Sequence, residues 1–269
     1  MTIEIGVFLP TSAPGPGQPV AGDVRASARF AEDSGLESVW STDHLIASAP
    51  MLDSTVALAT AAAVTERLKI GYGVLLLALR PVAWAAKQIS TLQQLSDGRL
   101  ALGVGTGNPA HGDIGWRAAG ASFEDRGRRT DEALRVLPDL VAGRASVLED
   151  GLEVTLAPGS AMPPVLVAGT GPKAMRRAAA HGDGWIPIGL SPDEVAAGVT
   201  ELAGLAAARG RTGPRATVVA PALDTDPGRA AAQLSAYAAA GAERVILAPT
   251  GAGWRPDYEF AANVRRALA

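Results

Sequence analysis

LQQLSDGRLALGVGTGN, residues 92–108, ends a helix, turns, and runs a strand into a glycine-rich segment. The leucines at 92 and 95 lie at helical spacing, and Asp97-Gly98 supplies a turn with a left-handed cap. The apolar residues that follow, at positions 100, 102 and 104, alternate as in a β-strand. Glycines then occupy positions 103, 105 and 107. Since glycine weakens a strand interior, this pattern predicts that another backbone or a flat ligand comes close there.

A dinucleotide-binding fingerprint is the first alternative for this glycine-rich segment. It requires G-x-G-x-x-G and a helix that begins at the last glycine, with its N-terminus toward a pyrophosphate. Here Asn108 and Pro109 follow the glycines, and no helical period returns until about Phe123. We therefore expect no dinucleotide site of this kind.

Composition limits the class of protein. The chain has 269 residues, 48% of them hydrophobic, and a length of about 250 residues is typical of an eight-fold β/α barrel, so we expect one domain over residues 1–269. The net charge of −3 gives no electrostatic argument for nucleic acid or an anionic membrane surface. The absence of cysteine excludes disulfides, thiolate metal sites and a cysteine nucleophile. We find neither an export signal nor an apolar run of membrane-spanning length, and expect a soluble cytoplasmic protein with no membrane partner.

Strands and helices alternate along the whole chain. The predicted strands cover residues 3–9, 38–42, 68–75, 100–104, 165–168, 185–188, 216–220 and 244–248. A helical pattern follows each of them, with the last helix beginning at Pro256, and a hairpin is expected between positions 147 and 156. Strict alternation of this kind predicts an α/β protein, a closed (β/α)8 TIM barrel, rather than a doubly wound open sheet.

The chemistry of such barrels lies on the loops that follow the strands. The loop segments we expect at this mouth are Asp43-His44, Gly73-Val74, Thr106-Gly107-Asn108, Gly169-Thr170-Gly171 and Asp183-Gly184-Trp185. An imidazole at His44 can act as acid or base near neutral pH, and the neighbouring carboxylate can fix its tautomer. A second candidate is His111, in the loop after the fourth strand, whereas His181 fits the C-terminal end of a helix.

The segment GTGPK, residues 169–173, suits an anionic phosphate. It combines free backbone amides, a helix N-terminus and nearby cations at Lys173, Arg176 and Arg177. An ordinary turn between a strand and a helix would use the same glycines and proline. The segment lacks the G-K-[ST] ending of a P-loop, so hydrolysis of nucleoside triphosphates is not supported. No two histidines share helical spacing, and we predict no metal site.

Taken together, these residues resemble the luciferase-like monooxygenase superfamily, whose TIM-barrel enzymes use flavin or coenzyme F420. The resemblance covers almost the whole chain and rests on AEDSGLESVW (31–40) running into Asp43-His44, Arg80-Pro81 with Ala86-Lys87, LSDGRL (95–100) running into GVGTG (103–107), Phe123 with Arg126 and Arg129, and GDGW (182–185). The chain looks most similar to the actinobacterial branch that uses coenzyme F420.

The resemblance implies roles for residues at the mouth. It places the catalytic pair, Asp43 and His44, beside the cofactor ring, with His44 as acid or base during hydride transfer. It implies a non-prolyl cis peptide between Gly73 and Val74, in a bulge behind the ring. Residues 106–108 would contact the polar edge of the ring, and residues 168–172 would bind the phosphate. The cofactor-binding residues it assigns are Asp43, Gly73, Val74, Thr106, Gly107, Asn108, Ala168, Gly169, Thr170, Gly171 and Pro172.

The activity that the resemblance implies is hydride transfer between coenzyme F420 and a small organic substrate. The alternative is an FMN-dependent monooxygenase that uses reduced flavin and O2, and a second alternative is a barrel that binds its cofactor without catalysis. The resemblance also implies a homodimer and a partner that reduces flavin or F420. F420-dependent glucose-6-phosphate dehydrogenases of this superfamily carry a glutamate after Gly-Thr-Gly, where this chain has Asn108. Because their proton donor is missing, we do not expect sugar-phosphate oxidation.

Overall fold

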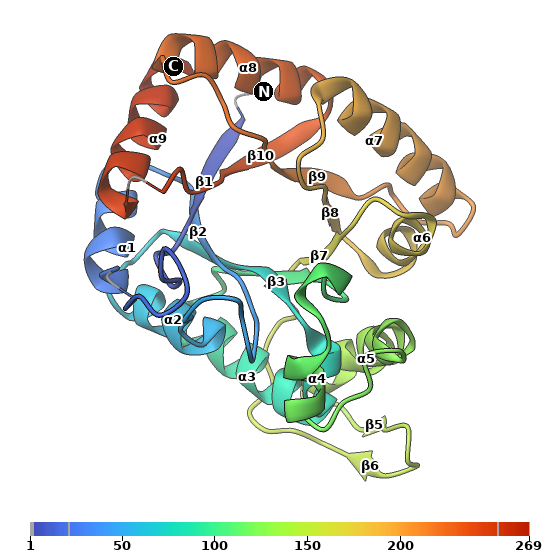
Figure 1. Ribbon diagram of the computed structural model, residues 1–269. Helices are drawn as coiled ribbons and strands as arrows, with labels where there is room; N and C mark the ends of the chain where they lie inside the picture. The colour runs from blue at the N-terminus through green and yellow to red at the C-terminus, as the bar shows by residue number, and fades with distance from the viewer. Residues whose placement is uncertain (1–2, 21, 252, 269) are drawn as a thin grey trace.

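The computed structural model describes residues 3–20, 22–251 and 253–268, and within them eight parallel strands close into a barrel (Figure 1). Their order around the barrel is β1-β10-β9-β8-β7-β4-β3-β2. The strands are β1 (Glu4–Phe8), β2 (Ser38–Ser41), β3 (Lys69–Leu75), β4 (Leu100–Val104), β7 (Val165–Ala168), β8 (Gly184–Ile186), β9 (Arg215–Val219) and β10 (Ala242–Leu247). This closed parallel arrangement confirms the predicted (β/α)8 barrel.

Helices cover the outside of the barrel (Figure 1). They are α1 (Val24–Asp33), α2 (Ser54–Ala63), α3 (Val82–Leu95), α5 (Arg126–Val141), α6 (Pro172–His181), α7 (Pro192–Ala207), α8 (Pro227–Ala239) and α9 (Trp254–Leu268). Side chains cap several N-termini, since Asp53, Ser191 and Asp226 each accept a hydrogen bond from a backbone N–H of the first turn. The expected hairpin is also present, as β5 (Ser146–Val147) and β6 (Glu153–Val154). No helix in these described ranges is long and apolar enough to cross a membrane.

The loop after β4 differs from its prediction. A short 3₁₀ helix η2 (Pro109–His111) and the helix α4 (Ile114–Ala118) lie before Phe123, where no helix was expected. The side-chain Oδ1 of Asn108 caps η2 by accepting a hydrogen bond from the backbone N–H of Ala110 at 3.0 Å. Elements of three and five residues are too short to show a hydrophobic period, which is why the sequence pattern missed them.

The glycines of β4 allow close approach of the neighbouring strand. A Cβ atom on Gly103 would lie 2.0 Å from the carbonyl oxygen of Tyr72, and one on Gly105 would lie 2.5 Å from Cγ2 of Val74. The predicted left-handed cap before this strand is also present, with φ of 51° at Asp97 and 76° at Gly98. The expectation that another backbone comes close is therefore confirmed at Gly103, whereas Gly105 faces the Val74 side chain.

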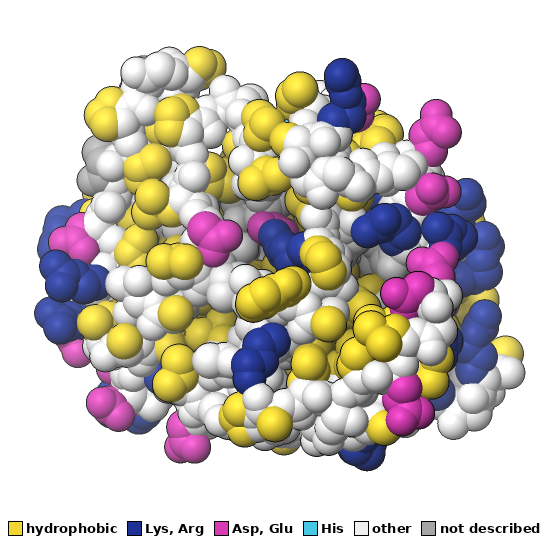
Figure 2. All heavy atoms as spheres, turned by 90° about the horizontal axis from the view of Figure 1, so that it is seen from below, with side chains coloured by type: hydrophobic (Ala, Val, Ile, Leu, Met, Phe, Trp, Pro, Cys, Tyr) yellow, Lys and Arg dark blue, Asp and Glu magenta, His cyan; other side chains and the backbone are white. Residues whose placement is uncertain are grey.

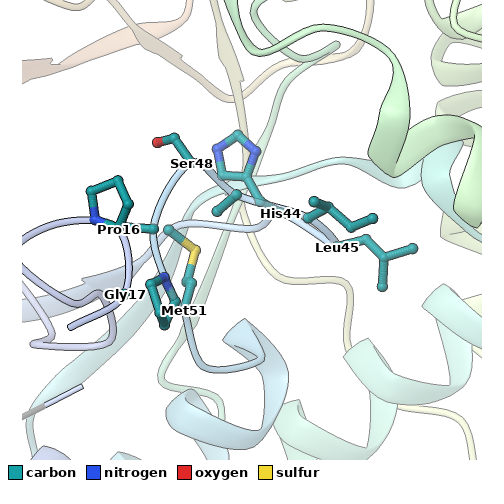
Figure 3. A pocket seen from close by; sticks show the side chains of 10 residues that line it. Pro16, Gly17, His44, Leu45, Ser48 and Met51 are labelled. Carbon is teal, nitrogen blue, oxygen red and sulfur yellow. The ribbon is translucent and has the colours of Figure 1, made fainter. Parts of the chain in front are cut away.

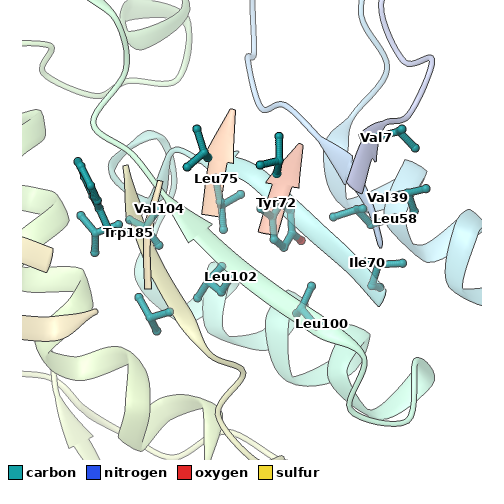
Figure 4. Packing of buried hydrophobic residues seen from close by; sticks show 14 of the residues in the cluster. Val7, Val39, Leu58, Ile70, Tyr72, Leu75, Leu100, Leu102, Val104 and Trp185 are labelled. Atoms are coloured by element: carbon teal, nitrogen blue, oxygen red, sulfur yellow. The ribbon is translucent and has the colours of Figure 1, made fainter. Parts of the chain in front are cut away.

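The core has two layers. Between the strands and the helices, buried aliphatic side chains pack with Tyr72 and Trp185 (Figure 4). A second cluster comes from strands that are not all neighbours and therefore fills the barrel itself: Trp40, Ala101, Leu166, Ile186 and Ile246. Four partly exposed apolar side chains border this inner cluster, namely Phe8, Val74, Ala168 and Val219.

A nearly buried ion pair lies at the amino ends of the strands. Glu37, just before β2, accepts hydrogen bonds of 2.6 Å from both Nε and Nη2 of Arg244 on β10, and one of 2.8 Å from Nζ of Lys69. Burial alone raises the pKa of Glu37, but the hydrogen bonds and the charge of Arg244 outweigh burial and hold this pKa at about 2. Charged groups at this end of a TIM barrel serve stability rather than chemistry, because the active sites of such barrels lie at the opposite face.

We expect Glu37→Gln to lower the free energy of unfolding by about 3–5 kcal/mol, because Arg244 then stays buried without its charged partner. Since folding depresses the pKa of Glu37, its contribution is complete above the unfolded carboxyl pKa and is lost as the pH falls toward 2. Urea unfolding at a series of pH values measures both effects.

The control for this substitution is Glu132→Gln, whose carboxylate pairs with Arg135 on the exposed side of α5. Exposed pairs contribute about 0–1 kcal/mol, so this variant should unfold almost as the wild type does. Equal losses in the two variants would contradict the structural importance of the pair between Glu37 and Arg244.

Candidate active site at the barrel mouth

The carboxyl ends of the parallel strands meet at one face, and most of the predicted site residues lie there. His44 follows β2, Gly73-Val74 belongs to β3, residues 106–108 follow β4, and residues 168–172 join β7 to α6. These four strands are consecutive neighbours around the barrel. The fold therefore gathers these segments at adjoining positions of the mouth.

Asp183 does not lie at the mouth, although the sequence predicted it there. It precedes β8 and lies at the opposite, amino end of the strands, where its Oδ2 accepts a hydrogen bond of 3.0 Å from the backbone N–H of Val165. Gly184 and Trp185 are residues of the strand itself. The sequence analysis recognised the GDGW motif, residues 182–185, but Asp183 lies before β8 rather than after it and is therefore not at the mouth.

Asp43 is buried at the end of β2 and its carboxylate accepts four hydrogen bonds. Oδ1 binds the hydroxyl of Ser54 at 3.2 Å and Nη2 of Arg80 at 2.9 Å. Oδ2 binds the backbone N–H of Leu76 at 2.9 Å and Nη1 of Arg80 at 3.0 Å. The ion pair with Arg80 is bidentate. The other two hydrogen bonds connect the end of β2 to the residue that follows β3 and to the first residue of α2. In the described structure no hydrogen bond joins Asp43 to the His44 imidazole, so the expected control of the tautomer by this carboxylate is not found.

His44 is half-buried and faces a second histidine. The ring centroids of His44 and His111 lie 4.9 Å apart with an angle of 71° between the ring planes. Burial lowers the pKa of His44 below its ordinary value, a positive charge on His111 lowers it further, and the Asp43 carboxylate opposes both. The neutral imidazole therefore predominates at pH 7 and is ready to accept a proton.

An apolar surface lies at the end of β3, the strand next to β2. A cis peptide bond joins Gly73 to Val74, and the pairing of β3 with β4 shifts register between Tyr72 and Leu75. The bulge and the cis bond that the resemblance implies are thus present. Val74 is partly exposed and borders the inner barrel cluster together with Phe8 and other apolar side chains. A flat aromatic ring could rest on such a surface with little desolvation of polar groups.

The segment between β7 and α6 ends in a helix N-terminus without a side-chain cap. Gly169 has a φ of 111°, and its carbonyl accepts a hydrogen bond of 2.8 Å from Nε1 of Trp185. Thr170, Gly171 and Lys173 are exposed. Backbone N–H groups at the start of a helix of this length can bind an anionic oxygen.

Arg177 is not available as the phosphate-binding cation that the sequence suggested. Its guanidinium turns to α5, where Nε lies 2.5 Å from Oδ1 of Asp131 and Nη2 donates to the carbonyl of Gly127 at 3.2 Å. Lys173 and Arg176, in contrast, are exposed on α6. The charge pattern of the sequence did not distinguish these roles, because the partner of Arg177 lies 46 residues away along the chain.

Sequence reasoning also missed residues that shape the mouth. Arg80 was recognised as part of a motif but not as the partner of Asp43, and Trp116 of α4 packs against Gly107. Asn108 caps η2 and so holds the turn that carries His111 beside His44. Among the described residues no cluster of histidine, aspartate and glutamate could hold a metal ion.

Comparison with known sequences places these features in a family. The luciferase-like monooxygenase family profile matches residues 3–253. An uncharacterized protein of Mycobacterium tuberculosis is 35% identical over 170 residues, which are 61% of this chain and 58% of that protein's length. A 5,10-methylenetetrahydromethanopterin reductase of Methanolobus tindarius is 29% identical over 232 residues, 82% of this chain and 68% of the reductase.

Solved structures share the fold. An F420-dependent secondary alcohol dehydrogenase, in complex with an F420-acetone adduct, superposes with a TM-score of 0.79 at 18% identity, covering 100% of this chain and 98% of that one. The oxygenating constituent of the Pseudomonas putida 3,6-diketocamphane monooxygenase, in complex with FMN, gives a TM-score of 0.80 at 17% identity with the same coverage. At these identities the likeness shows a common barrel.

We expect His111→Asn to raise the pKa of His44, because a positive neighbour is removed. The pKa should stay below that of an ordinary histidine, since burial remains. An NMR titration of the imidazole protons in both proteins measures the shift. His181, at the end of α6, is an internal control because its lowered pKa comes from burial and other neighbours. A pKa of His44 that does not change in the variant would refute the coupling.

Proposed function

This chain belongs to the luciferase-like monooxygenase family, and we propose that it is an oxidoreductase that transfers a hydride between coenzyme F420 and a small organic substrate. The arrangement of three features at the mouth supports this proposal most directly. A half-buried imidazole follows β2, a bulged apolar surface lies at the end of the neighbouring strand β3, and the N-terminus of α6 follows β7, two strands further around the barrel.

The residues of the mouth fit such a cofactor. The side chain of Val74 and its apolar neighbours offer a surface for a flat ring, and Thr106 offers a half-buried hydroxyl near it. Residues 168–172 offer backbone N–H groups at the start of α6, with Lys173 and Arg176 exposed on the same helix. An uncapped helix N-terminus with cations nearby favours a phosphate.

The bound deazaflavin would supply the hydride chemistry, and the chain would supply proton exchange. A neutral His44 accepts a proton at a ring nitrogen when the substrate gives up a hydride, and the imidazolium returns that proton in the reverse direction. Asp43 acts on this step through position, because its four hydrogen bonds fix the residue that precedes His44. His111, the second candidate, is exposed, whereas His44 is half-buried, and we therefore assign proton exchange to His44.

The likeness to the F420-dependent secondary alcohol dehydrogenase supports F420. The likeness to the FMN-containing monooxygenase constituent supports the alternative, an FMN-dependent monooxygenase that uses reduced flavin and O2. A barrel that binds its cofactor without catalysis is the second alternative. The homodimer, the reductase partner and the cytoplasmic location stay predictions.

Titration of the purified chain with F420 and with FMN tests the proposal, with quenching of tryptophan fluorescence as the readout because Trp116 packs at the mouth. We expect F420 to bind at least about tenfold more tightly than FMN, a difference of about 1.4 kcal/mol. Preference for FMN would favour oxygen chemistry, and binding of neither would refute a cofactor site.

The variant Thr170→Asp tests, in the same titration, whether the phosphate binds at the start of α6. A carboxylate at the start of α6 repels an anion, so we expect F420 affinity to fall about fivefold or more. Thr212→Asp is the matched control, since Thr212 is also exposed but lies in the loop before β9, at the amino end of the barrel. Equal effects of the two substitutions would place the phosphate elsewhere.

A further inference from the structure

A cavity of about 390 Å³ lies beside His44, between the loops that follow β1 and β2 (Figure 3). Its volume is within the range that small-molecule sites occupy. None of the ten described residues that line it carries a permanent charge: Pro16, Gly17, His44, Leu45, Ile46, Ala47, Ser48, Ala49, Pro50 and Met51. The cavity is therefore an uncharged site next to the proposed proton-exchanging group.

The walls of this cavity are joined by backbone hydrogen bonds. The N–H of Ala13 donates to the carbonyl of Pro50 at 2.8 Å, and the N–H of Leu52 donates to the carbonyl of Thr11 at 2.9 Å. At its other end the β2 loop is fixed by the buried carboxylate of Asp43. Both ends of the loop are thus anchored, so the cavity is a built feature of the fold.

Few side chains of the lining can form a hydrogen bond. His44 and Ser48 are the two with polar nitrogen or oxygen atoms, and both are labelled in Figure 3. Leu45 and Ile46 remain 56% and 44% exposed, which leaves apolar surface for a ligand to cover. A charged ligand would lose hydration here without gaining an oppositely charged partner, whereas an apolar one would lose little.

We do not expect the phosphate of the cofactor to bind in this cavity. A phosphate binds to cations and backbone N–H groups, and the lining offers no lysine or arginine. His44, Leu45 and Ile46 also border a second, narrower pocket, whose other lining residues include Gly107, His111 and Trp116. The imidazole therefore stands between the uncharged cavity and the segment that follows β4, where the ring is proposed to lie.

We propose that the cavity between the β1 and β2 loops, which is open to solvent, binds an uncharged small molecule whose polar group reaches the His44 imidazole. Leu45 and Ile46 determine this specificity by presenting apolar surface where a charged substrate would need a counter-ion. The inference rests on the proposed function, because it names the substrate class of that site.

The test compares two probes of nearly equal size, 2-naphthol and 2-naphthoate, at pH 7 on the chain without cofactor. Calorimetric titration measures the affinity and stoichiometry of each. We expect one molecule of 2-naphthol per chain and at least about tenfold weaker binding of 2-naphthoate. Because no cofactor is present, failure of this test and failure of F420 binding are separate results.

Leu45→Lys tests the specificity, since the exposed position tolerates a long side chain and the ammonium group supplies the missing counter-ion. We expect 2-naphthol to bind at least about fivefold more weakly and 2-naphthoate to bind more tightly. Leu95→Lys is the matched control, because Leu95 is 70% exposed at the end of α3, at the amino end of the barrel. Thermal melting shows whether both variants are folded.

Three results would overturn the proposal. One is that 2-naphthol does not bind to the wild type with saturation. Another is that 2-naphthoate binds as tightly as 2-naphthol. The last is that Leu95→Lys changes both affinities as much as Leu45→Lys does, which would mean that the probes bind to exposed apolar surface in general.

Discussion

The arrangement of the mouth depends on the buried carboxylate of Asp43. Its two oxygens accept both arms of the Arg80 guanidinium, the backbone N–H of Leu76 and the hydroxyl of Ser54. A buried charge is stable only when such partners replace its lost hydration. These contacts connect β2 with β3, α2 and the segment before α3, and they fix the residue next to His44. The position of the proposed proton-exchanging group therefore depends on this ion pair.

Stability and chemistry are separated along the barrel axis. At the amino ends of the strands, Glu37 and Arg244 form a nearly buried pair, and Arg99 donates hydrogen bonds to backbone carbonyls at the end of α2 and before β3. At the carboxyl ends a buried ion pair joins Asp43 to Arg80, and the side chains around it are mostly apolar, with two histidines among them. Burial and the charge of His111 lower the pKa of His44, and the uncharged lining beside it leaves room for the proposed substrate.

Much of the fold could be read from the sequence, because its signals are local. Alternating apolar residues gave the strands, and the glycine at position 98 gave the left-handed cap that ends α3. The cis bond at Gly73 was accessible only through resemblance to a family. Tertiary pairings were not accessible, since nothing local shows that Arg80 binds Asp43 or that Arg177 turns to Asp131. The cavity beside His44 is formed by two loops that meet only in the folded chain.

The most direct test of this account is the turnover of His44→Ala, measured beside its affinity for F420, with a substrate that the wild-type chain converts. A general acid or base contributes about 10²–10⁴ to a rate, so turnover should fall at least about tenfold while cofactor affinity changes little. His181→Ala, at the far end of α6, should turn over as the wild type does. Unchanged turnover in His44→Ala would contradict the assignment of His44 as the group that exchanges the proton.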